Sequence, residues 1–502
     1  MSIHKNHPKG LFLLFFVEMW ERFSYYGMRA LLVLYMVKYL MFSTEKSGQI
    51  YGWYTGMVYL TPLLGGYIAD RYLGQRKCIA IGAILMAIGH FAMAFPSLPF
   101  FFSALILLIM GNGFFKPNIS TVVGSLYEQN DPRRDSGFTI FYMGINLGAF
   151  LSPLVCSTLG EKVGWHYGFG AAGVGMVLGL VMFLWGQKAL LGDKGLKPAD
   201  PGGKIYVPVI LTMIILTFLV ASAFQFSGYD ITGAVRAFLA DGTFRLSGYD
   251  IGRIPGYAYA LLAGAALGGL AYGARASASK STLTSVEKRR VAVIFIMVFF
   301  AIFFWAAFEQ AGSSMTLFAD RETDRVLHLF GWSWEVPAGY FQSINPLIIF
   351  ILAPFFSKMW INLAISGREP SSPIKFAAGL GLLAVGFVVM IAAAGVYQQS
   401  GPVSIMWLVG AYFFHTLGEL CLSPVGLSLV TKLAPIQFGS LMMGVWLLSS
   451  FAANFVGGFF AGNYDAINHT LFYMIPTGTA AGAALLLLLI TPMLRKWMHG
   501  IH

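Results

Sequence analysis

Long apolar stretches follow one another along this chain, and short polar segments separate them. Fourteen of the stretches are long enough to cross a bilayer as helices, which takes about 20 residues each. The predicted spans are 11–40, 49–69, 77–95, 99–123, 136–158, 166–190, 205–226, 254–274, 289–311, 338–362, 374–397, 402–432, 437–462 and 468–494. The pattern therefore predicts an all-α membrane protein.

The composition agrees with this class, because 57% of the 502 residues are hydrophobic and only 11% are charged. A soluble domain carries about 25% charged residues. The net charge of +11 would suit a nucleic-acid partner, but we expect none, because the basic residues follow a membrane topology. Cys78, Cys156 and Cys421 lie in apolar stretches without the spacing of metal ligands, so we expect buried thiols and no metal site.

Lysine and arginine are unevenly distributed between the two sets of loops. The loops on the side of both termini carry 22 of the 33 Lys and Arg residues, the opposite loops carry 7, and four lie within helices. In membrane proteins the cytoplasmic loops carry the excess of basic residues. We therefore expect a multi-pass protein of the cell (inner) membrane, surrounded by membrane lipid, with both termini in the cytoplasm.

The spans fall into a group of six, a pair and a second group of six. We expect an N-terminal six-helix bundle over 1–190, linkers with an inserted helix pair over 191–288, and a C-terminal six-helix bundle over 289–502. Polar linkers on both sides of the pair are typical of an insertion between two bundles.

The first span carries its polar residues on one face. At 100° per residue this face holds Glu18, Glu21, Arg22, Tyr25, Tyr26 and Arg29. A charge in the bilayer core costs about 2.5–3.5 kcal/mol on insertion scales, so the face should meet protein or a watery cavity. Glu18 and Arg22 are one turn apart and are expected to pair, which leaves Glu21 and Arg29 for other partners. A structural ion pair is the alternative interpretation.

Two later helices share a pattern at matching positions of the two bundles. Gly111 to Pro117 and Gly418 to Pro424 both read Gly-x5-Pro, with a polar residue just before the proline. Interrupted helices at matching positions point to the midplane binding site of a transporter. Prolines are common in membrane helices in any case, but Lys116 and Glu419 within these segments favour a site.

Other polar residues lie within the predicted spans. Those one turn apart are Tyr142 and Asn146, Trp305 and Glu309, and Glu419 and Ser423. Asn345 precedes a proline that is expected to break its helix. Trp305 and Trp446 lie in mid-helix and are interpreted as cavity walls. His415, one turn before Glu419, is interpreted as a packed, hydrogen-bonded residue rather than a proton carrier.

Three motifs carry a resemblance to known transporters. The segment from Gly66 to Lys77, Gly-Tyr-Ile-Ala-Asp-Arg-Tyr-Leu-Gly-Gln-Arg-Lys, resembles the loop signature of the major facilitator superfamily. Glu18-x-x-Glu21-Arg22, followed by Tyr-Tyr-Gly, resembles the ExxER motif of proton-dependent oligopeptide transporters. Phe-Tyr-x-x-Ile-Asn-x-Gly over 141–148 is similar to the helix-5 signature of that family.

The resemblance implies a role for each matching residue. Residues implied in proton coupling are Glu18, Glu21, Arg22, Lys116 and Glu309, the last near the extracellular gate. Residues implied in substrate binding are Tyr26, Arg29, Tyr59, Lys116, Tyr142, Asn146, Trp305, Asn345, Glu419, Ser423 and Trp446. In the loop signature, a charge relay at the cytoplasmic gate would use Asp70, Arg71, Arg76 and Lys77. Protons would be the coupling ion, and no cofactor is implied.

One departure from the family pattern indicates which branch of the family this sequence resembles. Animal members use a histidine on the second helix, and this sequence has none between Gln49 and Arg71. Coupling would then rest on carboxylates, as in the bacterial branch of the family.

The resulting hypothesis is a proton-coupled symporter that imports di- and tripeptides by alternating access, and we expect a monomer. Its fold would be the major facilitator fold of two six-helix bundles, with two inserted helices. A same-fold transporter of nitrate or another small solute is an alternative, although Glu419 would repel an anion. A non-transporting nutrient sensor and a membrane-embedded enzyme are others, but the sequence offers no large soluble domain and no catalytic constellation.

Overall fold

The computed structural model describes part of the chain. The described residues are 7–128, 131, 133–197, 212, 215–216, 219–220, 222, 283–329, 331–435 and 439–500. The predicted span 254–274 and most of the predicted span 205–226 lie outside them. The two inserted helices therefore stay a prediction.

In the described chain, the other twelve predicted spans are helical over most of their length. Before residue 191 the helices are α1 (Lys9–Lys38), α2 (Thr44–Ile68), α3 (Gln75–Met93), α4 (Leu98–Ser125), α5 (Arg134–Thr158) and α6 (Trp165–Leu190). After residue 282 they are α10 (Ser285–Phe308), α11 (Ser314–Arg321), α12 (Ile344–Ile365), α13 (Ser372–Ser400), α14 (Met406–Leu433), α15 (Gly439–Ala461) and α16 (His469–Met498). Short π- or 3-10-helical turns extend several of them, over Ala69–Leu73, Leu159–Val163, Glu309–Gly312 and Ala338–Ser343.

Ten helical segments of the described chain are long and apolar enough to cross a membrane. α1 is not among them, since it carries Glu18, Glu21, Arg22 and Arg29 within its length. The three cysteines are buried free thiols, as predicted.

The expected interruption at the two matching prolines is wrong. α4 continues through Pro117 and α14 continues through Pro424 as uninterrupted α-helices. Proline removes one N–H group, but neighbouring helices satisfy the freed backbone groups in a membrane protein, so the helix need not end. Similarly, Pro346 does not break a helix: it lies in the first turn of α12, directly after the 3-10 turn Ala338–Ser343, where a missing N–H costs little.

Packing divides the chain into two compact units. Unit 1 comprises Met1–Tyr25, Leu60–Ile145 and Gly164–Gly268, and unit 2 comprises Tyr26–Tyr59, Asn146–Val163 and Gly269–His502. The boundaries fall inside α1, α2 and α5. Unit 2 therefore combines the second halves of α1 and α5 and the first half of α2 with all described helices after residue 282. The division into bundles over 1–190 and 289–502 stays a prediction.

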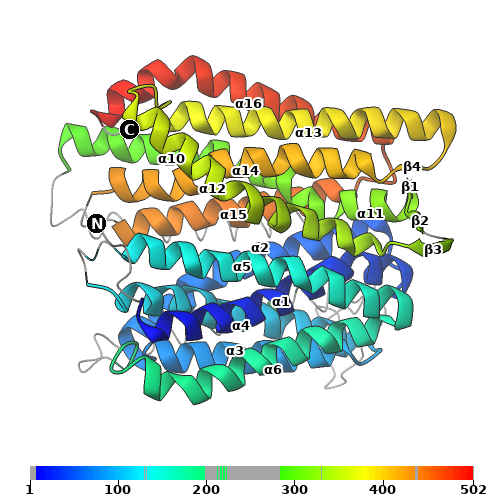
Figure 1. Cartoon of the computed structure of the whole chain (residues 1–502), viewed down its shortest axis with the longest axis horizontal. Helices are drawn as coiled ribbons and strands as arrows, with labels where there is room; N and C mark the ends of the chain where they lie inside the picture. Colours follow the sequence, from blue (N-terminus) through cyan, green and yellow to red (C-terminus); the bar gives the residue numbers. More distant parts are fainter. Residues whose placement is uncertain are drawn as a thin grey trace, which may run out of the picture. The chain divides into compact units, whose positions relative to one another are not determined.

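In unit 1, α3 packs against both α4 and α6 (Figure 1). Glycines allow the close approach of α3 and α4. A Cβ atom on Gly82 would lie 2.6 Å from the carbonyl oxygen of Gly111 and 2.7 Å from the backbone nitrogen of Phe115. Small residues at such contacts let backbones pack closely where no hydrophobic effect drives helices together.

In unit 2, α13 packs against α14 and α16, and α10 packs against α15 and α16 (Figure 1). The inner face of α13 holds Phe376, Leu380, Leu383 and Phe387, all fully buried and spaced at helical intervals. The described part of unit 2 also contains four short strands. β1 (Thr323–Asp324) pairs in parallel with β4 (Val403–Ser404).

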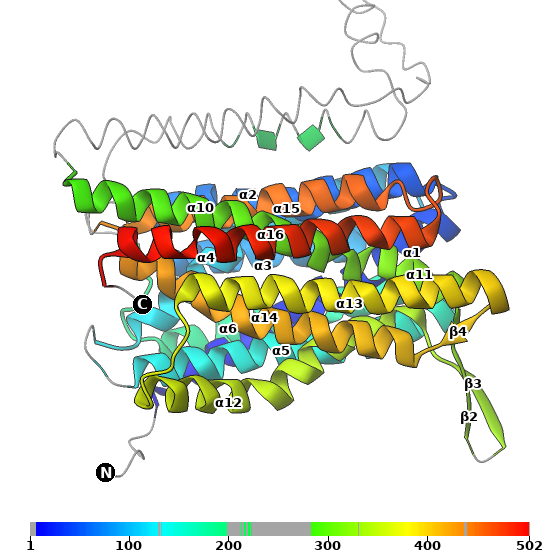
Figure 2. The same cartoon turned by 90° about the horizontal axis from the view of Figure 1, so that it is seen from above.

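The other two strands, β2 (Val326–Leu329) and β3 (Trp332–Glu335), form an antiparallel hairpin. Figure 2 shows this hairpin extending away from the helices of unit 2. We call the end of unit 2 at which α1 ends, and at which this hairpin lies, the distal end.

The α3–α4 contact yields a test. Replacing Gly82 by alanine places a methyl group on the backbone of α4, and overpacking of this kind costs about 1–3 kcal/mol. We expect Gly82→Ala to lower the midpoint of thermal unfolding in detergent. Gly381→Ala in α13 is the matched control, because a Cβ atom there meets nothing within 4 Å. Equal midpoints for the two variants would contradict the packing described here.

Candidate functional site

Two carboxylates share one guanidinium group in the middle of α1. Arg22 Nη2 donates to Glu21 Oε1 at 2.6 Å, its Nε also bonds Glu21, and this Nε lies 3.3 Å from Glu18 Oε1. All three residues are at most 1% exposed. The predicted pairing of Glu18 with Arg22 is confirmed. The expectation that Glu21 stays available is wrong, because the guanidinium of its chain neighbour reaches both carboxylates.

α4 supplies the polar neighbours of this cluster within unit 1. The side-chain amide of Asn112, which is buried, lies 3.4 Å from Glu21 Oε1. Lys116 follows Asn112 by four residues, one helical turn along the same face of α4. The charges of Glu18, Glu21 and Arg22 sum to −1.

The second half of α1 forms an ion pair in unit 2. Arg29 Nη2 bonds Glu309 Oε2, and Arg29 Nε donates to the hydroxyl of Tyr51 at 2.7 Å. The guanidinium also lies over the rings of Tyr26 and Tyr51, at 5.8 and 5.9 Å from their centroids. As predicted, Arg29 does not join the Glu18–Arg22 pair and binds other partners. Tyr51 carried no signal in the sequence, because tyrosines are frequent throughout these helices.

α12 and α14 bring two predicted substrate residues together. Asn345 Nδ2 donates to Glu419 Oε2 at 2.8 Å and to the hydroxyl of Thr416 at 3.1 Å. Glu419 is 9% exposed, and no ion pair to it is found among the described residues. One turn along α14, the buried hydroxyl oxygen of Ser423 has no hydrogen-bond partner in the described chain. Asn345, Thr416 and Ser423 thus place neutral polar groups around the carboxylate of Glu419, and no cation in the described chain pairs with that carboxylate.

The predicted aromatic walls have different surroundings. Trp446 is buried, packs edge-on to Phe376 at 6.1 Å and fills the space left by Gly426. Trp305 is half-buried beside Phe308, and its indole nitrogen is buried without a hydrogen-bond partner among the described residues. These contacts place both indoles within unit 2.

The remaining predicted substrate residues differ in exposure. Asn146 is buried, Tyr26 and Tyr59 are half-buried and Tyr142 is exposed. Tyr142 belongs to unit 1 and Asn146 to unit 2, although both lie on α5. Their roles in binding stay predictions.

The charged residues of the loop signature between α2 and α3 make local contacts, and their predicted relay stays a prediction. Buried Arg76 donates to the carbonyl oxygens of Lys194, at 2.5 Å, and Gly192, at 2.6 Å. Asp70 is exposed and accepts a hydrogen bond from Gln75 at 2.8 Å. Arg71 lies over the ring of Tyr67, and Lys77 is exposed. Arg76 therefore holds the segment that follows α6, a contact that the motif alone does not predict.

His415 packs as predicted but does not form the predicted hydrogen bond. Its ring lies 4.5 Å from that of Phe387, and both ring nitrogens are buried without a hydrogen-bond partner among the described residues. The expectation of a hydrogen bond is wrong, because aromatic side chains surround the imidazole. In the described chain no group of three His, Cys, Asp or Glu residues could hold a metal ion.

Comparison with known proteins identifies relatives along nearly the whole chain. The sequence model of the POT family matches residues 76–476. The peptide transporter YePEPT of Yersinia enterocolitica subsp. palearctica serotype O:3 (strain YE-P4) is 37% identical over 518 residues, 99% of this chain and 96% of the relative. A di-/tripeptide transporter of Lactococcus lactis subsp. cremoris is 33% identical over 510 residues, 99% of this chain and 98% of the relative.

A solved structure agrees with these relatives. The crystal structure of peptide transporter POT in complex with sulfate has a TM-score of 0.84 to this chain at 36% identity. The similarity covers 99% of this chain and 97% of that chain. The predicted all-α transporter fold is confirmed.

Proposed function

We propose that this chain, which belongs to the POT family, is a proton-coupled symporter that imports di- and tripeptides by alternating access. Glu419 carries the proposal. It is a buried carboxylate whose described side-chain partner is an amide and not a cation. A buried carboxylate without a cation is costly, so the ammonium group of a peptide is its natural partner. The names of the relatives, a peptide transporter and a di-/tripeptide transporter, support this choice of substrate.

In this proposal the peptide amine binds beside Glu419, and Asn345 and Ser423 accept or donate the remaining hydrogen bonds. The peptide carboxylate binds Arg29 and Lys116. Since Arg29 pairs with Glu309 in this structure, carboxylate binding requires that this pair be shared or exchanged. Side chains proposed to line the path are Tyr26, Tyr59, Tyr142, Asn146, Trp305 and Trp446.

Proton coupling is proposed to rest on the cluster around Arg22. One guanidinium cannot fully compensate two buried carboxylates, so a proton on one of them is the proposed complement. Protonation of Glu18 or Glu21 would change which partner the remaining carboxylate binds, and Lys116 on α4 is the proposed second cation. The Arg29–Glu309 ion pair would break or form when the transporter changes between its inward-open and outward-open states. Protons are the coupling ion, and no other cofactor is required.

The proposed location is the bacterial inner membrane, with a monomer whose two termini lie in the cytoplasm. The excess of basic residues on the loops of the terminal side supports this orientation. The distal end would then face the outside of the cell, and the Arg76 contact with the segment after α6 would lie at the cytoplasmic side.

Uptake into proteoliposomes tests the function directly. We expect labelled dialanine to accumulate when the outside is made acidic, and the accumulation to collapse when a protonophore is added. Nitrate uptake under the same gradient is not expected, because Glu419 repels an anion. Accumulation that ignores the pH gradient, or a protein that binds dialanine without moving it, would contradict the proposal.

Glu21→Gln tests the coupling group. Glutamine keeps the size and one hydrogen bond to Arg22 but cannot take up a proton, so we expect gradient-driven dialanine accumulation to be lost. Exchange of dialanine across the membrane without a gradient should remain in part. Glu45→Gln, at an exposed position near the start of α2, is the matched control and should accumulate normally. Full accumulation by Glu21→Gln would rule out this role.

Glu419→Gln tests whether Glu419 binds the amino group of the peptide. Charge-assisted hydrogen bonds contribute about 1.5–3 kcal/mol, so the parent should bind dialanine roughly ten- to a hundredfold more tightly than N-acetyl-dialanine. In Glu419→Gln, dialanine should weaken far more than the acetylated peptide does. Competition of both peptides against labelled substrate measures this. Equal losses for the two peptides would show that Glu419 stabilises the bundle instead.

A further inference from the structure

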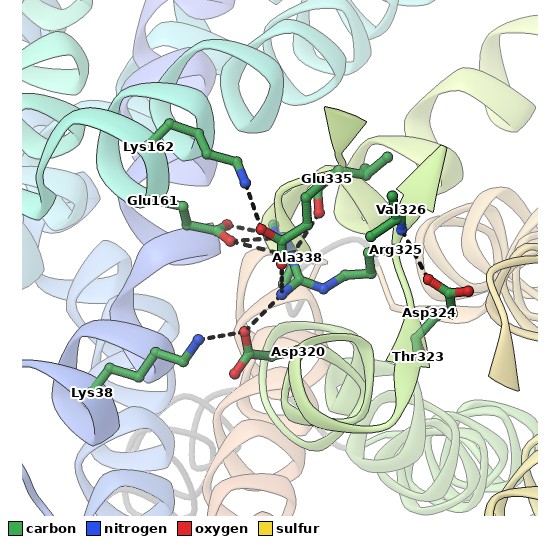
Figure 3. A network of polar contacts seen from close by, with 12 residues as sticks. Lys38, Glu161, Lys162, Asp320, Thr323, Asp324, Arg325, Val326, Glu335 and Ala338 are labelled. Carbon is green, nitrogen blue, oxygen red and sulfur yellow. Dashed lines mark hydrogen bonds and ion pairs between the residues drawn. The ribbon is translucent and has the colours of Figure 1, made fainter. Parts of the chain in front are cut away.

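A second cluster of charges lies at the distal end of unit 2, away from the proposed substrate residues. Figure 3 shows its centre, Arg325, between strands β1 and β2. The guanidinium lies 2.9 Å from Glu335 Oε1, 3.2 Å from Asp320 Oδ1 and 3.7 Å from Glu161 Oε2. It also donates to the carbonyl oxygen of Val336 at 2.6 Å. Arg325 is only 8% exposed, so these partners replace nearly all of its water.

Two lysines complete the cluster. Lys38 at the end of α1 lies 2.5 Å from Asp320 Oδ1, and Lys162 beyond the end of α5 lies 2.8 Å from Glu335 Oε2. The hydrogen bond from Lys162, followed by the nearby charge of Arg325, lowers the pKa of Glu335. The cluster then holds three cations and three carboxylates and is electrically balanced. Balance of this kind makes burial of Asp320 and Arg325 tolerable.

The charges come from two separate parts of the chain. Lys38 ends α1, and Glu161 and Lys162 follow α5; both helices belong to the proposed N-terminal bundle. Asp320, Arg325 and Glu335 belong to the segment between α10 and α12. The hairpin fixes the last two, because Val326 pairs with Glu335 and the backbone N–H of Val336 donates to the carbonyl of Arg325. Arg325 thus joins the two parts at one point.

Glu161 adds a second kind of bond. Its two oxygens accept hydrogen bonds from the backbone N–H groups of Ala338, at 2.9 Å, and Gly339, at 3.1 Å. These are the first residues of the 3-10 turn before α12, where N–H groups lack partners within the turn. One carboxylate therefore binds both the arginine and the start of the turn that leads into α12.

Close packing continues this contact toward α5. The space at Gly339 is filled by the side chain of Ser157, so a Cβ atom does not fit there. The hydroxyl of Ser343 donates to the carbonyl oxygen of Phe150 at 2.8 Å, and the hydroxyls of Thr158 and Tyr340 lie 2.6 Å apart. We call this contact between α5 and the turn Ala338–Ser343 the distal seam.

We propose that Arg325 is a gating residue, the hub of a lock that closes the distal seam and that acts separately from the Arg29–Glu309 pair. Opening of this side separates α1 and α5 from the segment between α10 and α12, so Arg325 must leave Glu161 before the seam can part. The strength of the cluster then sets how often this side opens. The proposal rests on the alternating-access function proposed above.

A cysteine in the seam reports its opening. Ser157 is fully buried, and cysteine replaces it with little change in size. The protein would carry Ser157→Cys, with its three native cysteines replaced by alanine, in intact cells. A membrane-impermeant maleimide added outside reacts only when the seam opens. We expect Arg325→Met to raise the labelling rate about tenfold, which corresponds to about 1.4 kcal/mol.

Two further variants keep this test decisive. Glu161→Gln removes one charge but keeps an acceptor for the turn, so it should also speed labelling and should fold if Arg325→Met does not. Arg133→Met is the matched control, since Arg133 pairs with Asp131 within one loop of unit 1 and should leave the rate unchanged. Rates equal to the parent in both Arg325→Met and Glu161→Gln, in protein that elutes as a single species, would overturn the proposal.

The labelling experiment is independent of transport. Faster labelling in a protein that does not accumulate dialanine would support the lock and contradict the proposed symport. Normal, proton-driven accumulation with unchanged labelling would do the reverse. The two proposals therefore fail in different ways.

Discussion

The cost of burying charge governs the organisation of this protein. A lone ion inside an apolar environment is so unfavourable that each one must find a partner, a proton or water. In the described chain, Arg22 binds two carboxylates, Arg29 binds Glu309, and Arg325 binds three carboxylates. Glu419 differs from these three arginines, because its described partner is an amide and not an opposite charge. The paired arginines are therefore suited to holding the fold together, whereas the carboxylate of Glu419 is suited to binding a positively charged ligand.

The same constraint acts on the backbone. α4 and α14 continue through their prolines because an apolar environment offers the freed carbonyl groups no water. Glycines such as Gly82 and Gly339 permit contacts at which any side chain would collide with a neighbour. The helices therefore approach one another closely enough for short side chains, such as Ser157 and Ser343, to reach across the gap.

Much of the architecture could be predicted from the sequence, because apolar spans in a membrane follow from length and hydropathy alone. The pairing of Glu18 with Arg22 followed from helical spacing. Asn345 bonds Glu419, and the role of both in substrate binding stays a prediction. Partners distant in sequence could not be predicted in this way. Tyr51 beside Arg29, or the carbonyls held by Arg76, depend on tertiary packing that no local pattern encodes. Arg325 looked like an ordinary loop arginine, since only the folded hairpin brings it to Glu161.

The two kinds of bond made by Glu161 have a consequence for behaviour in salt. Mobile ions screen exposed pairs such as Lys162–Glu335 over about 8 Å at physiological ionic strength, but they reach a buried pair such as Arg325–Asp320 far less. The backbone N–H groups bound by Glu161 carry no net charge and are hardly affected. The distal seam should therefore hold in dilute and in concentrated salt solutions alike, which would suit the outward orientation proposed for this end.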